Sequence, residues 1–179
     1  KTYNLQQTLR KHINFPKLIG SQLARYYGLL KTSTKYIHFL DDDDYIFPKM
    51  YSNAKQIMIS NNKINLLSFN AKYQRKNLFR NNLKTEIITN RINGLIKKSE
   101  LLISNKVGPT SGAIICTDIL YKIDSFNPGV RLRQDYSNWL LISNEDVLVY
   151  ASSELGFYYE TQVLSSIFQS NPFKNGYSI

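Results

Sequence analysis

The stretch Tyr36-Ile37-His38-Phe39-Leu40-Asp41-Asp42-Asp43-Asp44 joins an aromatic and β-branched run to four consecutive aspartates. The apolar run is typical of a buried β-strand, so the aspartates are predicted to stand at its carboxyl end. Neighbouring carboxylates repel one another by about 1 kcal/mol per close pair even in water, and a buried strand that ends this way needs a compensating cation. Hard divalent ions such as Mg²⁺ and Mn²⁺ prefer oxygen ligands and share their coordination sphere with phosphates and water. The alternative is a solvated acidic turn that caps a helix beginning near Pro48.

Helices and strands are predicted to alternate on both sides of this stretch. Apolar residues at helical spacing predict helices over residues 18–30, 48–60 and 135–142, and Asp118 is placed to cap or open a short helix through Tyr121. Short apolar runs predict strands over residues 64–69, 112–116, 147–151 and 156–159, whereas the polar stretch 72–93 is predicted to be irregular. The alternation predicts an α/β layer architecture with a mostly parallel sheet flanked by helices, in which ligands bind beyond the carboxyl ends of the strands. The four aspartates would lie at that edge.

The composition predicts a single basic domain over residues 1–179. With 42% apolar residues the chain has the material for a core, and no repeat or linker divides it. Its 23 Lys and Arg against 13 Asp and Glu give a net charge of +10, which favours nucleic acid, phospholipid head groups or a phosphorylated substrate as partners. Cys116 is the single cysteine and forms no intramolecular disulfide, and no apolar stretch approaches the roughly 18 residues that span a bilayer. We therefore expect a cytoplasmic protein.

A second carboxylate, Asp135, stands alone among arginines in the segment Arg131-Leu132-Arg133-Gln134-Asp135-Tyr136, just before a predicted helix. A carboxylate near a hydroxyl can take its proton while the bond to an electrophile forms, so Asp135 is a candidate general base. The alternatives are a helix N-cap and a surface ion pair to Arg131 or Arg133. Four further residues are predicted to serve core packing: His38, Trp139 and the pair Tyr158-Tyr159.

Several motifs together resemble the family 2 glycosyltransferases of the GT-A fold, the Rossmann-like fold of nucleotide-diphospho-sugar transferases. In that family the order is G-x-x-x-A-R-N-x-G, an apolar strand running into L-D-x-D-D, then G-F-D and finally E-D-Y-x-L-W. The corresponding segments here are Gly20-Ser21-Gln22-Leu23-Ala24-Arg25-Tyr26-Tyr27-Gly28, the 36–44 stretch with its DxD motif, Phe126-Asn127-Pro128-Gly129 and Gln134-Asp135-Tyr136-Ser137-Asn138-Trp139-Leu140. Order and spacing agree over residues 18 to 142.

The resemblance implies transfer of a sugar from a nucleotide diphosphate sugar to an acceptor hydroxyl with inversion, in bacterial cell-surface polysaccharide synthesis. It implies that Asp135 is the catalytic base. It assigns Arg25, Asp41 and Asp42 to the donor, and Asp43 and Asp41 to a Mn²⁺ or Mg²⁺ ion that bridges the diphosphate. The expected partners are the nucleotide sugar and a carbohydrate or lipid-linked acceptor, with peripheral contact to the inner face of an anionic membrane.

The chain departs from the family pattern at Tyr26, which replaces Asn, and at Gln134, which replaces the Glu before the base. No strand is predicted before Gly20, so we expect the chain to be an N-terminally truncated domain without the first nucleotide-binding strands. Three other functions stay open at this point. They are a basic nucleic-acid-binding module, prompted by the charge and by residues 72–80, a metal-dependent nucleotidyl transferase, and a non-catalytic remnant of a glycosyltransferase.

Overall fold

The computed structural model describes residues 13–14, 19–76, 84–89, 93–126, 129 and 133–159. The helices in these ranges are α1 (Gly20–Leu30), α2 (Met50–Ser60), α3 (Lys98–Ile103), α4 (Thr117–Lys122) and α5 (Gln134–Ser143), with a short 3₁₀ turn η1 (Thr110–Gly112). The four predicted helices are confirmed as α1, α2, α4 and α5. α3, which is 6 residues long, was not predicted.

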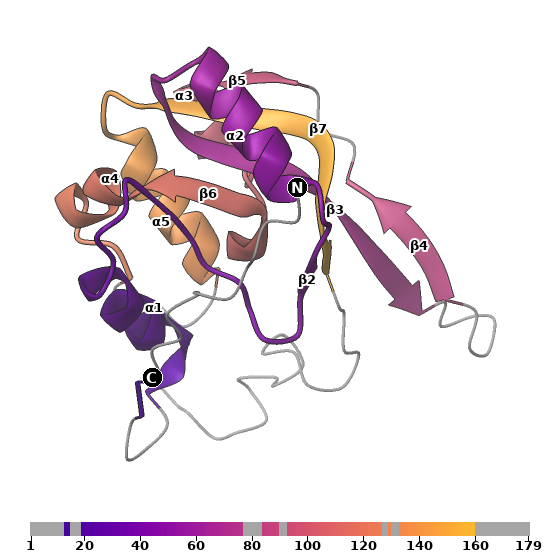
Figure 1. Ribbon diagram of the computed structural model, residues 1–179, viewed down its shortest axis with the longest axis horizontal. Coiled ribbons are helices and arrows are strands. Elements are labelled where there is room, and N and C mark those ends of the chain that lie inside the picture. The colour runs from indigo at the N-terminus through magenta and orange to yellow at the C-terminus, as the bar shows by residue number, and fades with distance from the viewer. Residues whose placement is uncertain are drawn as a thin grey trace, which may run out of the picture.

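The strands are β1 (Tyr36–His38), β2 (Tyr45–Ile46), β3 (Ile64–Lys76), β4 (Lys84–Ile88), β5 (Gly94–Ile96), β6 (Ala113–Cys116) and β7 (Leu148–Tyr159). The two strands predicted after residue 147 form one continuous strand, β7, which is irregular opposite Asn70. The stretch 72–93, predicted to be irregular, contains instead the end of β3 paired with the whole of β4 (Figure 1). Neither the end of β3 nor β4 was predicted, because polar residues mask the strand pattern there.

All seven strands belong to one mixed sheet in the order β1-β6-β3-β7-β2, with β4 beside β3 and β5 beside β7. Only β3 and β7 pair in parallel among the described strands, and the other five pairings are antiparallel. The prediction of a mostly parallel sheet is therefore wrong for this part of the chain. The main reason is β6, which inserts antiparallel between β1 and β3, so that β1, β3 and β7 still run in the same direction.

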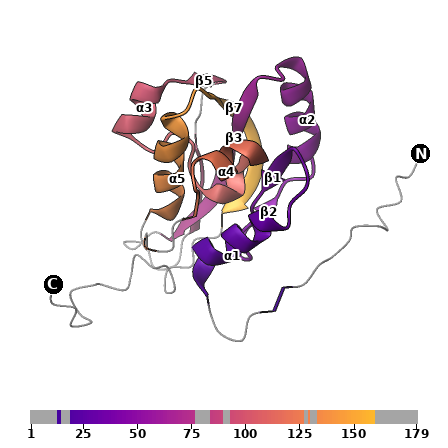
Figure 2. The ribbon, with the colours of Figure 1, turned by 90° about the vertical axis from the view of Figure 1, so that its left-hand side faces the viewer.

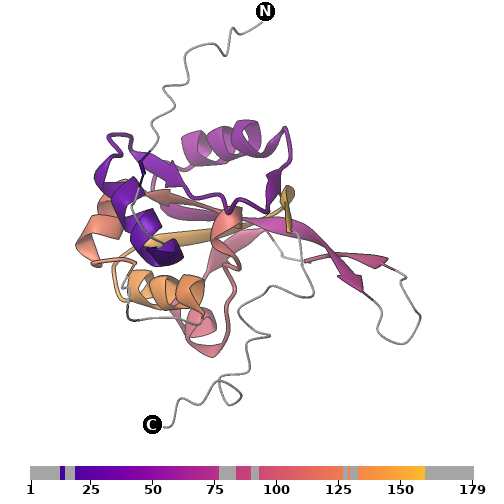
Figure 3. The same ribbon diagram turned by 90° about the horizontal axis from the view of Figure 1, so that it is seen from below.

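Helices cover both faces of this sheet, as predicted. α2 packs on one face, where Met50, Ala54 and Met58 meet the side chains of Leu67 and Phe69 from β3. The other helices cover the opposite face and share a second core, to which they contribute Leu29, Leu101, Leu120, Trp139 and Ile142. Figures 2 and 3 show the resulting three layers, with the sheet between α2 and the remaining helices. No helix in the described ranges is long and apolar enough to cross a membrane.

Three chain segments meet at one edge of the sheet. Because β6 is antiparallel to β1, with His38 opposite Ile114, the loop after β1 lies beside η1 at the amino end of β6. β7 runs in the direction of β1, so its carboxyl-terminal residue Tyr159 reaches the same edge. This edge therefore collects the aspartates that follow β1.

Candidate active site

A cavity of about 670 Å³ opens at this edge of the sheet. It is lined by α1, the loop after β1, the segment between α3 and η1, the start of α5 and the end of β7. Five side chains were predicted for the site, and all of them line this cavity: Arg25, Asp41, Asp42, Asp43 and Asp135. The tertiary structure therefore brings together two acidic positions that are more than 90 residues apart in the sequence.

The four consecutive aspartates have different surroundings. Asp41 is half-buried and forms an ion pair with the guanidinium of Arg25, whose side chain is 12% exposed. Asp42 and Asp43 are exposed and face the cavity, whereas Asp44 is buried and does not line it. α2 begins at Met50 and has no acidic residue in its first turn, so the predicted alternative of a helix-capping acidic turn is wrong.

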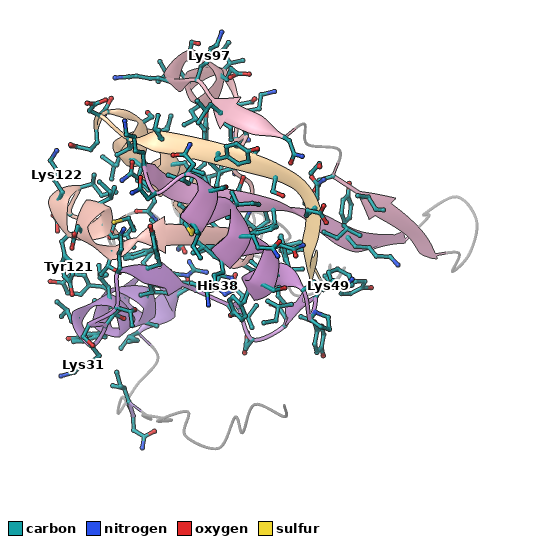
Figure 4. All side chains as sticks on the ribbon, turned by 45° about the horizontal axis from the view of Figure 1, so that its top comes forward. Lys31, His38, Lys49, Lys97, Tyr121 and Lys122 are labelled. Carbon is teal, nitrogen blue, oxygen red and sulfur yellow. The ribbon has the colours of Figure 1, made fainter. Side chains whose placement is uncertain are left out.

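Ser111 and His38 hold the backbone of Asp41. The backbone N–H of Asp41 donates to the Ser111 hydroxyl at 3.1 Å, and the carbonyl of Ser111 lies 2.9 Å from Nε2 of His38. The other ring nitrogen, Nδ1, lies 2.9 Å from the hydroxyl of Tyr51. Burial lowers the pKa of His38, which favours a neutral ring that donates from Nε2 and accepts at Nδ1. His38 (Figure 4) is thus a satisfied internal residue, as predicted, and it also anchors the start of the acidic loop.

Replacement of Ser111 by Ala is expected to lower the free energy of unfolding by about 1 kcal/mol, because the N–H of Asp41 loses its acceptor. Urea unfolding at pH 7 measures this change. Ser68→Ala is the matched control, since Ser68 is also fully buried and its hydroxyl has no hydrogen-bond partner among the described residues. Equal losses in the two variants would mean that the Asp41–Ser111 bond contributes nothing.

Asp135 is the second residue of α5. Its Oδ1 accepts from the N–H of Tyr136 at 2.7 Å, and its Oδ2 accepts from the side-chain amide of Asn105 at 3.3 Å. Burial raises the pKa of Asp135, and these hydrogen bonds together with the charge of Arg25 partly offset that rise. A raised pKa makes a carboxylate a better proton acceptor.

The two structural alternatives for Asp135 are wrong where the structure tests them. The N-cap position of α5 is occupied by Arg133, which has a left-handed backbone with φ of 51°. In the described ranges Asp135 forms no ion pair with Arg133, and Arg131 lies outside the described residues. The conformation of Arg133 costs a non-glycine residue about 1 kcal/mol or more, and such strain is typical of functional sites.

Asn105 and Ser21 line the cavity and were not predicted as site residues. The side-chain amide of Asn105 donates to the carboxylate of Asp135, and its Oδ1 accepts from the N–H of Gly108 at 2.7 Å. Ser21 donates to the side-chain carbonyl of Gln134 at 2.6 Å and so joins α1 to α5 beside the cavity. Their sequence neighbourhoods indicate only a turn and a helix start, so no local pattern marks them.

Tyr159 was predicted to be a core residue, and this prediction is wrong. Its side chain is 36% exposed and lines the cavity, unlike Trp139, which is confirmed in the core at 1% exposure. Burial raises the pKa of Tyr159, and the negative charges of Asp44, Asp43, Asp41 and Asp135 raise it further. The hydroxyl of Tyr159 therefore lies in the combined negative field of the carboxylates.

The carboxylates of this cavity fit a hard divalent cation. Neither Asp42 nor Asp43 has a hydrogen-bond or ion-pair partner among the described residues, and one oxygen of Asp41 is engaged by Arg25. No group of three or more His, Cys, Asp or Glu within the described ranges is placed to enclose a metal ion. The available donors are carboxylate oxygens, and Mg²⁺ binds through one or two of these when phosphates and water complete its shell.

The fold is similar to solved structures, although no protein-family model and no curated protein sequence matches the chain. A crystal structure of residues 1–349 of S. aureus TarS has a TM-score of 0.62 at 17% identity, with 82% of this chain and 42% of that chain covered. A second TarS structure has a TM-score of 0.57 at 17% identity, with 76% and 24% covered. The chain has a glycosyltransferase-like fold.

A third structure, TarS 1–349 in complex with UDP-GlcNAc, gives a TM-score of 0.55 at 17% identity. This alignment covers 77% of the present chain and 38% of that chain. In all three comparisons the chain spans less than half the length of the TarS chain. The likeness concerns the fold.

Proposed function

We propose that the protein is a metal-dependent, inverting glycosyltransferase of family 2 that transfers a sugar from a nucleotide diphosphate sugar to an acceptor hydroxyl. The observation that supports this most is the shared cavity, in which Asp41, Asp42 and Asp43 face the same space as Asp135. The TarS fold is a second support, because that protein has been crystallised with UDP-GlcNAc, a donor of this class. The strongly acidic lining does not favour nucleic acid as the ligand of this cavity.

In this proposal the donor lies over the loop after β1. Arg25 supplies positive charge toward the donor phosphates, while Asp41 and Asp42 bind the donor. Asp43 and Asp41 are the residues that would hold Mn²⁺ or Mg²⁺. When bound, such an ion offsets the negative charge that develops on the departing nucleotide diphosphate.

The acceptor hydroxyl is placed next to Asp135. Its oxygen attacks the anomeric carbon from the side opposite the diphosphate, and the carboxylate of Asp135 takes the hydroxyl proton as the new carbon–oxygen bond forms. The old carbon–oxygen bond breaks, and its electron pair leaves with the nucleotide diphosphate. Asn105 orients the carboxylate through its hydrogen bond to Oδ2. Synthesis of a bacterial surface polysaccharide on the cytoplasmic side of the membrane is the setting that we propose.

The full-length protein is expected to hydrolyse or transfer at least one member of a panel of nucleotide sugars in the presence of Mn²⁺, and to lose this turnover with a chelator. Asp43→Asn is expected to lower the metal-dependent rate by about 10²–10³-fold, because an electrostatic contribution at the leaving group is removed. Asp146→Asn is the matched control, since Asp146 is exposed and does not line the cavity. Failure of every donor to turn over would favour a non-catalytic remnant.

A further inference from the structure

One surface beside the cavity exposes large apolar side chains. Leu95 on β5 is 55% exposed, and Leu102 and Ile103 at the end of α3 are 60% and 82% exposed. Ile103 is the most exposed large apolar side chain in the described part of the chain. Burying two adjacent apolar side chains of this size away from water is favourable in free energy. They are therefore candidates for contact with an apolar partner.

The protein holds these side chains outward by fixing α3 from the other side. Leu101 is 1% exposed in the core, and its carbonyl accepts from the hydroxyl of Tyr136 at 2.6 Å. At the start of α3 the side chain of Glu100 accepts from the N–H of Lys97 at 2.8 Å. The exposure of Leu102 and Ile103 is therefore a consequence of how α3 is anchored.

Positive charge surrounds the apolar pair. Lys97, Lys98 and Lys106 are all exposed, and Figure 4 shows Lys97 on the outer surface of the molecule. Between residues 93 and 106 the sequence holds one acidic residue, Glu100, whose side chain is engaged in the capping bond. Apolar side chains flanked by lysines are suited to the interface of a bilayer with anionic lipids, where the lysines meet phosphate groups and the apolar side chains enter the acyl boundary.

The surface is continuous with the cavity on the side of the proposed base. Ile103, Ser104 and Asn105 line the cavity, and Asn105 contacts Asp135 directly. We propose that the segment 95–106 is a docking surface for an anionic phospholipid bilayer, with Leu102 and Ile103 inserted and Lys97, Lys98 and Lys106 on the lipid phosphates. This placement turns the Asp135 side of the cavity toward the membrane. The acceptor is therefore a lipid-linked sugar, an inference that rests on the proposed function.

Co-sedimentation with vesicles tests the docking surface without any need for turnover. The full-length protein is expected to sediment with vesicles of phosphatidylglycerol and phosphatidylcholine and to stay in solution with phosphatidylcholine alone. The double variant Leu102→Ser/Ile103→Ser is expected to lower the partition coefficient about tenfold or more, because two apolar side chains no longer enter the bilayer. Lys97→Glu/Lys98→Glu is expected to lower it by about tenfold as well.

Ile59→Ser and Lys49→Glu are the matched controls. Ile59 is 70% exposed on α2, and Figure 4 shows Lys49 well separated from Lys97. Neither control is expected to change sedimentation. Equal binding to neutral and anionic vesicles would overturn the docking surface, and so would an equal loss of vesicle binding in the control variants. It would also be overturned if the same variants lost binding to single-stranded RNA in the same pattern. Because Asp43→Asn should keep vesicle binding while losing turnover, a failure of the catalytic proposal is distinguishable from a failure of this one.

Discussion

Asp135→Asn is expected to lower the rate of sugar transfer by about 10²–10⁴-fold while the protein stays folded. The amide keeps the size of the side chain but cannot take the proton of the acceptor hydroxyl. Steady-state kinetics with saturating donor should show the loss in kcat, and donor binding by calorimetry should change little because Asp135 does not hold the donor. A variant that retains the wild-type kcat would remove Asp135 from the mechanism.

The pH dependence of stability separates this catalytic role from a structural one. Because burial raises the pKa of Asp135 above its usual 3.8, the folded state prefers the protonated side chain. The stability that this preference contributes is fully present below pH 3.8 and is lost as the pH rises through the raised pKa. Compared with the wild type, Asp135→Asn should therefore be relatively more stable at pH 7 than at pH 3.5 in urea unfolding. A variant that is much less stable at pH 7 would indicate a structural role.

Trp139→Ala is expected to lower the free energy of unfolding by about 3–5 kcal/mol. Trp139 is 1% exposed in the core beneath α5, and its indole N–H donates to the carbonyl of Gly108 at 2.8 Å. Truncation leaves a cavity and removes that hydrogen bond. A typical domain has only about 5–15 kcal/mol of stability, so the loss should be evident as a shift in the urea midpoint.

Trp139→Phe is the matched control, because it retains most of the apolar ring and removes the hydrogen bond. We expect this variant to lose about 1–2 kcal/mol. Gly108 also accepts from Asn105, so the loop that orients Asp135 should loosen in both variants. A change below 1 kcal/mol for Trp139→Ala would contradict the packing of α5 against the sheet.

Local pattern in the sequence was sufficient for most helices and for the position of the acidic loop. α1, α2 and α5 follow from apolar spacing, α4 follows from Asp118 at its start, and β1, β3 and β6 follow from short apolar runs. The predicted site residues meet in one cavity because the strand that precedes the aspartates ends, and the helix that carries Asp135 begins, at the same edge of the sheet.

Strand direction and the supporting residues of the site were decided only by the tertiary structure. All four residues of β6 are buried, and a continuous apolar run of this kind is typical of a parallel strand, so the sequence pattern did not reveal the antiparallel direction of β6. Asp41 and Ser111 are 70 residues apart in the sequence, and Asn105 and Asp135 are 30 apart. Contacts at such separations depend on how the whole sheet assembles, whereas the periodicity that reveals a helix or a strand is a property of a few neighbouring residues.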